Sequence, residues 1–91
     1  GLSPRDFTPE ALIPVLDRRL PGFEQVMFSE GLTHTPRAVL SRCLAGTLGR
    51  TMLIALPGSR LAAKENLAAL LPVLPHALEK LNGDMRDCGR S

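Results

Sequence analysis

Residues 44–59 read LAGTLGRTMLIALPGS, and this stretch decides the fold. The apolar runs 43–47 and 51–56 predict two strands, joined by a tight turn at Leu48-Gly49-Arg50. The second run, TMLIAL, is apolar on both faces apart from its first residue, which predicts an interior strand of a covered sheet. Pro57-Gly58-Ser59 then leads into a helix, and strand, glycine turn and helix form the unit from which α/β domains are built.

A long helical pattern follows this unit. Its apolar residues recur at steps of three, four and one, which predicts one continuous face made of Ala63, Leu67, Leu70, Leu71, Leu74, Ala77, Leu78 and Leu81. Pro72 and Pro75 divide the pattern into two segments, because proline breaks the hydrogen bonding of a helix interior. Asn82-Gly83 ends the second segment.

Working toward the N-terminus, the sequence predicts further helices. Thr8-Pro9-Glu10 reads as a helix start, with a hydroxyl at the N-cap, proline at the first helical position and an acid in the first turn. The apolar face of this helix continues to Leu20, and Pro14 inside it should kink or split the helix. We expect Leu20-Pro21-Gly22 to end the segment.

A second, shorter helix is expected at residues 23–30, with Gly31 as its stop. Thr35-Pro36 repeats the N-cap pattern and should begin a short turn that runs through Leu40. With at most two predicted strands, the chain looks like the second half of a doubly wound domain. We therefore expect residues 1–83 to belong to that domain and residues 84–91 to form a polar tail.

Composition excludes several classes of function. The 91 residues carry a net charge of +2 and 3% aromatic residues, so neither a basic patch nor a stacking surface for nucleic acid is expected. No apolar run approaches the length of a membrane span, so we expect no membrane insertion. The two cysteines, Cys43 and Cys88, lack a metal-binding spacing; reduced thiols are expected, with a disulfide as the alternative.

The turn at residues 56–59, LPGS, is a candidate anion site. The backbone N–H groups of Gly58, Ser59 and Arg60 would lie at a helix N-terminus, where phosphate binds readily. The Ser59 hydroxyl either touches the ligand or only caps the helix. In the alternative interpretation, Gly58 makes the turn and no ligand is involved.

Ser41 and Arg42 form a second candidate, just before the first predicted strand. A hydroxyl beside a guanidinium suits a phosphate oxygen, although a pair at the end of an element is often only a surface feature. Arg37 and Arg60 could extend a basic pocket. These residues indicate phosphate binding only in combination.

Asp6 has two interpretations. It either caps a turn or pairs with Arg5, or its carboxylate holds Mg²⁺ that bridges nucleotide phosphates. His34 and His76 have no carboxylate or cysteine at ligand spacing, and we expect no catalytic role for them. Cys43 is expected to be a small core residue.

Three stretches in this order resemble the molybdopterin-binding MogA/MoaB family. They are GLSPRDFTPEA at 1–11, TPRAVLSR at 35–42 and LAGTLGRTMLIALPGS at 44–59. The closing stretch AAKENLAALLPVLPHALEKLNGD, residues 62–84, is similar to the eukaryotic-type G domains of that family, such as the G domain of gephyrin. The resemblance covers nearly the whole chain, and the combination of motifs is specific where each one alone is weak.

The resemblance implies a fold, an activity and a setting. The family fold is a three-layer α/β sandwich, αβα, and is usually trimeric. The implied activity is molybdopterin adenylyltransferase: with Mg²⁺, AMP passes from ATP to the terminal phosphate of molybdopterin and pyrophosphate is released. From the resemblance we expect a homotrimer in the cytoplasm that acts in molybdenum cofactor biosynthesis.

The resemblance also implies site residues. Asp6 matches the family's PRD aspartate, which is tied to catalysis and to metal binding, and Gly1 matches the last glycine of the TGGTG phosphate loop. Ser41 and Arg42 match the SR pair that faces the pterin phosphate. The remaining expected binding residues belong to the same motifs: Ser3, Arg5, Thr8, Glu10, Pro57, Gly58 and Ser59.

The chain departs from the family pattern in one respect. The family's first half, with most of TGGTG and a second essential acid, is absent from these residues. Three explanations stay open: the sequence is a fragment, a second polypeptide supplies that half, or catalysis has been lost. The alternative hypothesis is a non-catalytic molybdopterin-binding, scaffold or oligomerisation module. A third hypothesis, a nucleotide hydrolase of the CinA-like type, ranks below both because those proteins lack PRD-x-TPEA.

Overall fold

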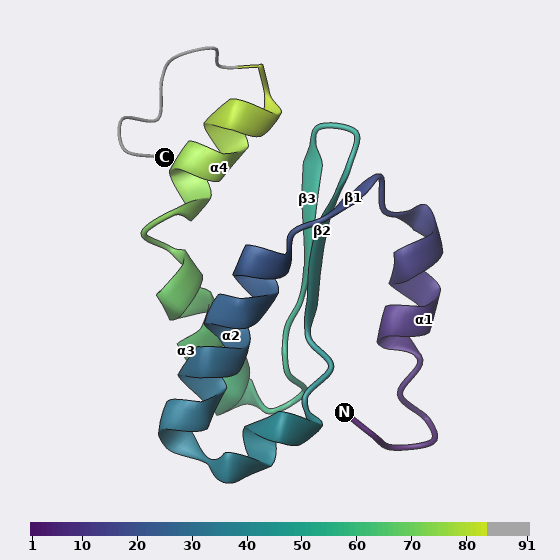
Figure 1. Ribbon diagram of the computed structural model, residues 1–91, viewed down its shortest axis with the longest axis vertical. Coiled ribbons are helices and arrows are strands. Elements are labelled where there is room, and N and C mark those ends of the chain that lie inside the picture. Colours follow the sequence, from purple (N-terminus) through teal and green to yellow (C-terminus); the bar gives the residue numbers. More distant parts are fainter. Residues whose placement is uncertain (84–91) are drawn as a thin grey trace.

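The computed structural model describes residues 1–83, so the tail expected at 84–91, with Cys88, lies outside the described residues. Its elements, with η for 3₁₀ helices, are α1 (Thr8–Leu12), η1 (Ile13–Val15), β1 (Arg18–Arg19), α2 (Pro21–His34), η2 (Pro36–Leu40), β2 (Leu44–Leu48), β3 (Thr51–Ala55), α3 (Arg60–Leu70) and α4 (Leu74–Leu81). Figure 1 shows α1 on one side of the strands and α2 and α3 on the other. The fold is therefore of the α/β kind that the sequence predicted.

The two predicted strands are confirmed to within one residue. The sheet has three strands in the order β1-β2-β3, all antiparallel, and Leu44 pairs with Ala55 while Leu48 pairs with Thr51. Gly49 adopts φ 59° in the turn between β2 and β3, a conformation that glycine reaches without strain. The prediction that residues 51–56 form an interior strand is wrong for the described residues: β2 lies in the middle of the sheet and is the more buried strand.

The sequence did not predict β1. The expected helix to Leu20 is wrong, because Pro14 has no backbone N–H and the chain continues only as the short turn η1. Leu16 then turns to extended backbone, with φ −76° and ψ 135°. The backbone of the following residues pairs with β2, and the N–H of Leu20 donates to the carbonyl of Ala45 over 2.9 Å. Tertiary pairing thus overrides the helical pattern here.

Helix limits differ from the sequence prediction at three places. Thr8 is the first residue of α1 instead of its N-cap, and its N–H donates to Oδ1 of Asp6 over 3.2 Å. Pro21, expected to end a helix, begins α2, where its missing N–H removes no helical hydrogen bond. Helix α2 also continues past Gly31, the predicted stop; a Cβ there would lie 2.9 Å from the Ala38 Cβ, so glycine lets η2 pack closely.

Other local predictions are confirmed. Thr35 caps η2 by accepting from the N–H of Arg37, and Ser59 caps α3 by accepting from the N–H of Ala62. The last helical pattern divides into α3 and α4, and Pro75 lies in the first turn of α4. Within residues 1–83, none of these helices combines the length and the apolar character that a membrane crossing requires.

The core lies between α2, the sheet and α3. Met27, Ala45 and Leu70 are fully buried there. Partly buried apolar residues pack around them, namely Leu20, Phe23, Cys43, Ile54, Leu56 and Leu74. Cys43 thus contacts the core as predicted, although β2 begins one residue after it. This small core holds the start of β2 and the end of β3, which carry the candidate site.

Gly46 provides a test of the β1–β2 contact. A Cβ on this residue would lie 2.5 Å from the carbonyl oxygen of Arg18 and 2.6 Å from a methyl carbon of Leu16. The carbonyl belongs to the paired strand and cannot move without breaking the pair. We expect Gly46→Ala to lower the free energy of unfolding by about 1–3 kcal/mol in urea denaturation. Gly22→Ala is the control, because a Cβ there meets nothing within 4 Å; equal losses in both variants would contradict the prediction.

Candidate functional site

Three segments that are distant in sequence meet at one end of the sheet. Because Leu44 of β2 pairs with Ala55 of β3, the residues just before β2 lie beside the residues just after β3. The N-terminal segment joins them around a hollow of about 250 Å³. Seven of the predicted site residues line this hollow: Gly1, Asp6, Thr8, Ser41, Arg42, Pro57 and Gly58.

The other predicted site residues lie outside the lining of the hollow. The backbone N–H of Arg5 donates to the Ser3 hydroxyl over 3.2 Å, and these two residues shape the N-terminal segment. Ser59 uses its hydroxyl to cap α3, which favours the capping role over ligand contact. Glu10 approaches the site only through its contact with Arg42.

Asp6 presents an ionised carboxylate at the hollow. Its Oδ2 lies 2.8 Å from the Gly1 backbone nitrogen and 3.8 Å from Nη2 of Arg42, and its Oδ1 accepts from the N–H of Thr8. Hydrogen bonds, first with the Gly1 backbone nitrogen and then with the Thr8 amide, hold the pKa of Asp6 below its ordinary value. Asp6 therefore caps the turn through the Thr8 N–H, and the arginine that it pairs with is Arg42 instead of Arg5.

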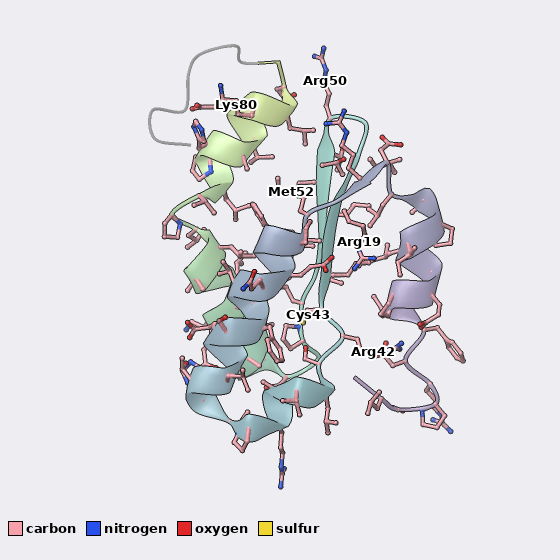
Figure 2. All side chains as sticks on the ribbon, in the orientation of Figure 1. Arg19, Arg42, Cys43, Arg50, Met52 and Lys80 are labelled. Atoms are coloured by element: carbon pink, nitrogen blue, oxygen red, sulfur yellow. The ribbon has the colours of Figure 1, made fainter. Side chains whose placement is uncertain are left out.

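Arg42 connects the strand side of the site to the N-terminal segment, toward which Figure 2 shows it extending. Its Nε donates to the Gly1 carbonyl over 2.7 Å, and its Nη2 donates to the Asp6 carbonyl over 2.6 Å. Nη1 and Nη2 also donate to the two carboxylate oxygens of Glu10, over 2.7 and 3.1 Å. These hydrogen bonds hold the pKa of the Glu10 carboxyl below its ordinary value.

Cys43 is a lining residue that sequence reasoning missed. It was expected only in the core, yet it also lines the hollow, and its Sγ lies 3.0 Å from the Ser41 hydroxyl oxygen. The contact places the Ser41 hydroxyl beside the Cys43 thiol, in the lining that also includes Pro57 and Gly58. Only the two-residue spacing between Ser41 and Cys43 could have indicated the contact from sequence.

His34 has carboxylate neighbours, contrary to the prediction. Its Nε2 lies 2.6 Å from Oε2 of Glu30, one turn earlier in α2, and its Nδ1 lies 3.2 Å from Oε2 of Glu65 in α3. His34 and Glu65 line a second hollow of about 270 Å³, which shares Gly1, Ser41, Pro57 and Gly58 with the first. Among residues 1–83, no group of three such side chains has a geometry that could hold a metal ion.

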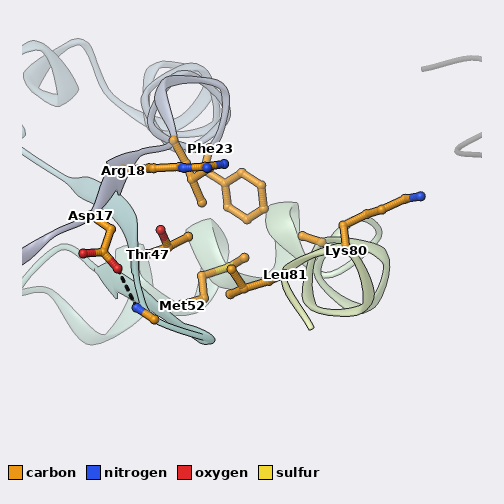
Figure 3. Close-up of a pocket in the computed structure, with 10 residues that line it drawn as sticks. Asp17, Arg18, Phe23, Thr47, Met52, Lys80 and Leu81 are labelled. Carbon is orange, nitrogen blue, oxygen red and sulfur yellow. Dashed lines mark hydrogen bonds between the residues drawn. The ribbon is translucent and has the colours of Figure 1, made fainter. Parts of the chain in front are cut away.

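A larger hollow of about 690 Å³ lies toward the opposite end of the hairpin (Figure 3). None of the predicted site residues lines it. Its carboxylate, on Asp17, already accepts from the N–H of Gly49 over 2.7 Å, and Figure 3 shows the Lys80 side chain pointing away. The volume of a hollow therefore does not identify the site. The smaller hollow is favoured because a carboxylate, a hydroxyl and a guanidinium, from Asp6, Ser41 and Arg42, line it.

Comparison with known proteins agrees with the motifs. A family model described as "Probable molybdopterin binding domain" matches residues 1–76. Gephyrin of Dictyostelium discoideum is 49% identical over 82 residues, which are 90% of this chain and 11% of that protein. Molybdopterin adenylyltransferase of Helicobacter pylori is 37% identical over 84 residues, covering 92% of this chain and 48% of the enzyme.

Solved structures show the same similarity. The molybdopterin biosynthesis enzyme MoaB from Thermus thermophilus superposes with a TM-score of 0.82 at 54% identity, and the match covers 91% of this chain and 52% of that structure. The chain therefore spans about half the length of this structure and of the adenylyltransferase.

Proposed function

The chain belongs to the family of molybdopterin-binding domains, and on this premise we propose that it acts in molybdenum cofactor biosynthesis by adenylyl transfer. In this reaction AMP passes from ATP to the terminal phosphate of molybdopterin. The observation that carries the proposal is the convergence of the Asp6 carboxylate, the Ser41 hydroxyl and the Gly58 loop around one hollow. A relative at 37% identity is named for this activity, which supports the same assignment.

The chemistry needs positioning more than a protein nucleophile. A terminal phosphate oxygen of molybdopterin attacks the α-phosphorus of ATP, the bond from that phosphorus to the bridging oxygen breaks, and pyrophosphate leaves with the electron pair. We assign the orientation of the phosphates to the Ser41 hydroxyl and to the backbone N–H groups at the start of α3. These groups act by holding the two substrates in line.

Asp6 suits a magnesium ion. Magnesium in nucleotide sites takes one or two carboxylates together with substrate phosphates and water, and a carboxylate with a lowered pKa is ionised at neutral pH. When bound, Mg²⁺ neutralises charge that develops on the phosphates. Asp6 would hold the ion, while the Thr8 amide at 3.2 Å orients the carboxylate.

We propose further that residues 1–83 form one part of a domain and that another polypeptide segment completes it. Two observations support this. The chain spans 52% of the solved MoaB structure, and β3 has a strand partner on one side only within the described residues. An apolar strand with a free edge is a template for strand addition. A homotrimer and a cytoplasmic location, which the family resemblance implies, belong to the same proposal.

One observation favours the alternative, a non-catalytic binding module. The hollow of about 250 Å³ is below the range of roughly 300–1,000 Å³ usual for small-molecule sites, and adenylyl transfer brings two substrates together. In a binding module, the only role of Asp6 would be to accept the Thr8 N–H and so stabilise the turn. Ligand binding would then be indifferent to the charge of Asp6.

A thermal melt of the 91-residue chain, with and without Mg-ATP, separates these candidates. We expect Mg-ATP to raise the melting temperature, because a ligand at about 100 times its Kd stabilises the folded state by about 2.7 kcal/mol. Asp6→Asn should abolish the increase. If the melt is cooperative but indifferent to Mg-ATP, the binding module is favoured. If no cooperative transition occurs, the measurement is repeated with the complementary half of the MoaB relative added. A melting temperature of that mixture that Mg-ATP does not change would reject the catalytic proposal.

A further inference from the structure

We propose that Arg42 and Glu10 are positioning residues, and that the guanidinium holds the Asp6 loop (residues 1–7) instead of binding a substrate phosphate. The family resemblance implied the opposite role for Arg42. The consequence for Mg-ATP binding rests on the proposed function, whereas the positioning role itself rests on the contacts below.

The hydrogen-bonding capacity of Arg42 is nearly used within the chain. A guanidinium has five N–H donors, and those of Arg42 make four hydrogen bonds to Gly1, Asp6 and Glu10. Two of the bonds form a bidentate pair with Glu10, the strong geometry for arginine and a carboxylate. A phosphate would have to displace this pair before it could bind the guanidinium in the same way.

The same contacts determine where Asp6 lies. Arg42 bonds to groups that are 41, 36 and 32 positions away in sequence, so it links the Asp6 loop and α1 to the segment before β2. The bond to the Asp6 carbonyl fixes the backbone, and the Thr8 N–H then orients the carboxylate. Helix α1 buries only Pro9, so apolar packing contributes little to holding this segment.

The charge of Glu10 distinguishes the two roles of Arg42. If Arg42 binds phosphate, Glu10 competes with the substrate, and Glu10→Gln should tighten phosphate binding. If Arg42 positions the Asp6 loop, Glu10→Gln weakens the bidentate Arg42–Glu10 pair that holds the loop. The variant should then bind Mg-ATP more weakly. The two roles therefore predict opposite signs for one conservative change.

The test uses Glu10→Gln, Arg42→Lys and their combination in the full chain. We expect hydrogen exchange at the Thr8 amide, measured by NMR, to become about tenfold faster in each variant, because this amide bonds to Asp6. The Kd for Mg-ATP should rise about tenfold in each single variant and hardly further in the double variant, since the two residues act as one unit. Arg19→Lys is the matched control: it alters a second arginine–carboxylate pair, with Glu24, that does not line the hollow.

Each outcome decides the proposal. Unchanged Thr8 exchange in Glu10→Gln, or tighter binding of Mg-ATP in that variant, would overturn the positioning role. Equal acceleration in Arg19→Lys would also overturn it, because the effect would then be general. If the unmutated chain binds no Mg-ATP even with the complementary half of the MoaB relative, the proposed function fails by itself, and Thr8 exchange still decides the role of Arg42 and Glu10.

Discussion

We expect Asp6→Asn to lower the rate of the proposed adenylyl transfer by about 10²–10³-fold, the loss expected when one group that stabilises transition-state charge is removed. Asparagine has nearly the same shape and can still accept from the Thr8 N–H, so the turn should persist. It lacks the negative charge that a magnesium ion requires. The measurement is pyrophosphate release from Mg-ATP with molybdopterin present, using the chain together with the complementary half of the MoaB relative.

Asp17→Asn is the matched control for this experiment. Asp17 also accepts a backbone N–H, from Gly49, but it lies toward the other end of the hairpin and does not line the Asp6 hollow. We expect the Asp17→Asn rate to stay within about twofold of the unmutated rate, because a surface change away from the site has a small effect. A folded Asp6→Asn variant that keeps full activity would show that the Asp6 charge serves only the turn.

Leu70→Ala has the largest expected effect on stability. Leu70 is 0% exposed and packs in the core with Met27 and Ala45. Truncating a buried leucine removes transferred apolar surface and leaves a cavity, which costs about 2–5 kcal/mol. Domains of this size have little stability in reserve, so we expect a large unfolded fraction without denaturant. Urea denaturation followed by circular dichroism measures the loss.

Leu61→Ala provides the comparison within the same helix. Leu61 is 65% exposed, so its truncation should change the free energy of unfolding by less than about 0.5 kcal/mol. Similar losses in the two variants would mean that α3 does not pack through Leu70. A small effect of Leu70→Ala alone would mean that the core tolerates the cavity by collapse.

The sequence predicted those parts of the fold that depend on local interactions. The hairpin could be predicted from two apolar runs and the glycine between them, Gly49. The caps at Thr35 and Ser59 could be predicted from a hydroxyl residue placed just before a helix. It did not predict β1, because two exposed arginines become a strand only by pairing with β2. Gly31 was misread for a related reason: the glycine makes room for Ala38, and that contact is tertiary.

The site was predictable to a similar extent. Motif resemblance grouped Asp6, Ser41 and Gly58 in one predicted site, and these three residues line one hollow in the structure. It did not show that Arg42 is already bonded to Glu10, since the two residues are 32 positions apart. The Glu65 partner of His34 was missed because it reaches the imidazole from another helix, and Glu30 was missed because the helix was expected to stop at Gly31. Such long-range partners follow from the packing of elements, which no local pattern encodes.

The short turn between β2 and β3 has a consequence for the order of folding. Only Gly49 and Arg50 separate the two strands, so closing this hairpin restricts little of the chain, and such hairpins form in about 1–10 μs. The Arg42–Glu10 contact joins residues that are 32 positions apart in sequence. Forming it therefore costs more chain entropy than closing the β2–β3 hairpin. The strands should therefore be present in the folding transition state before the Asp6 hollow exists. Weakening the Arg42–Glu10 contact would then accelerate unfolding while the folding rate stays nearly unchanged.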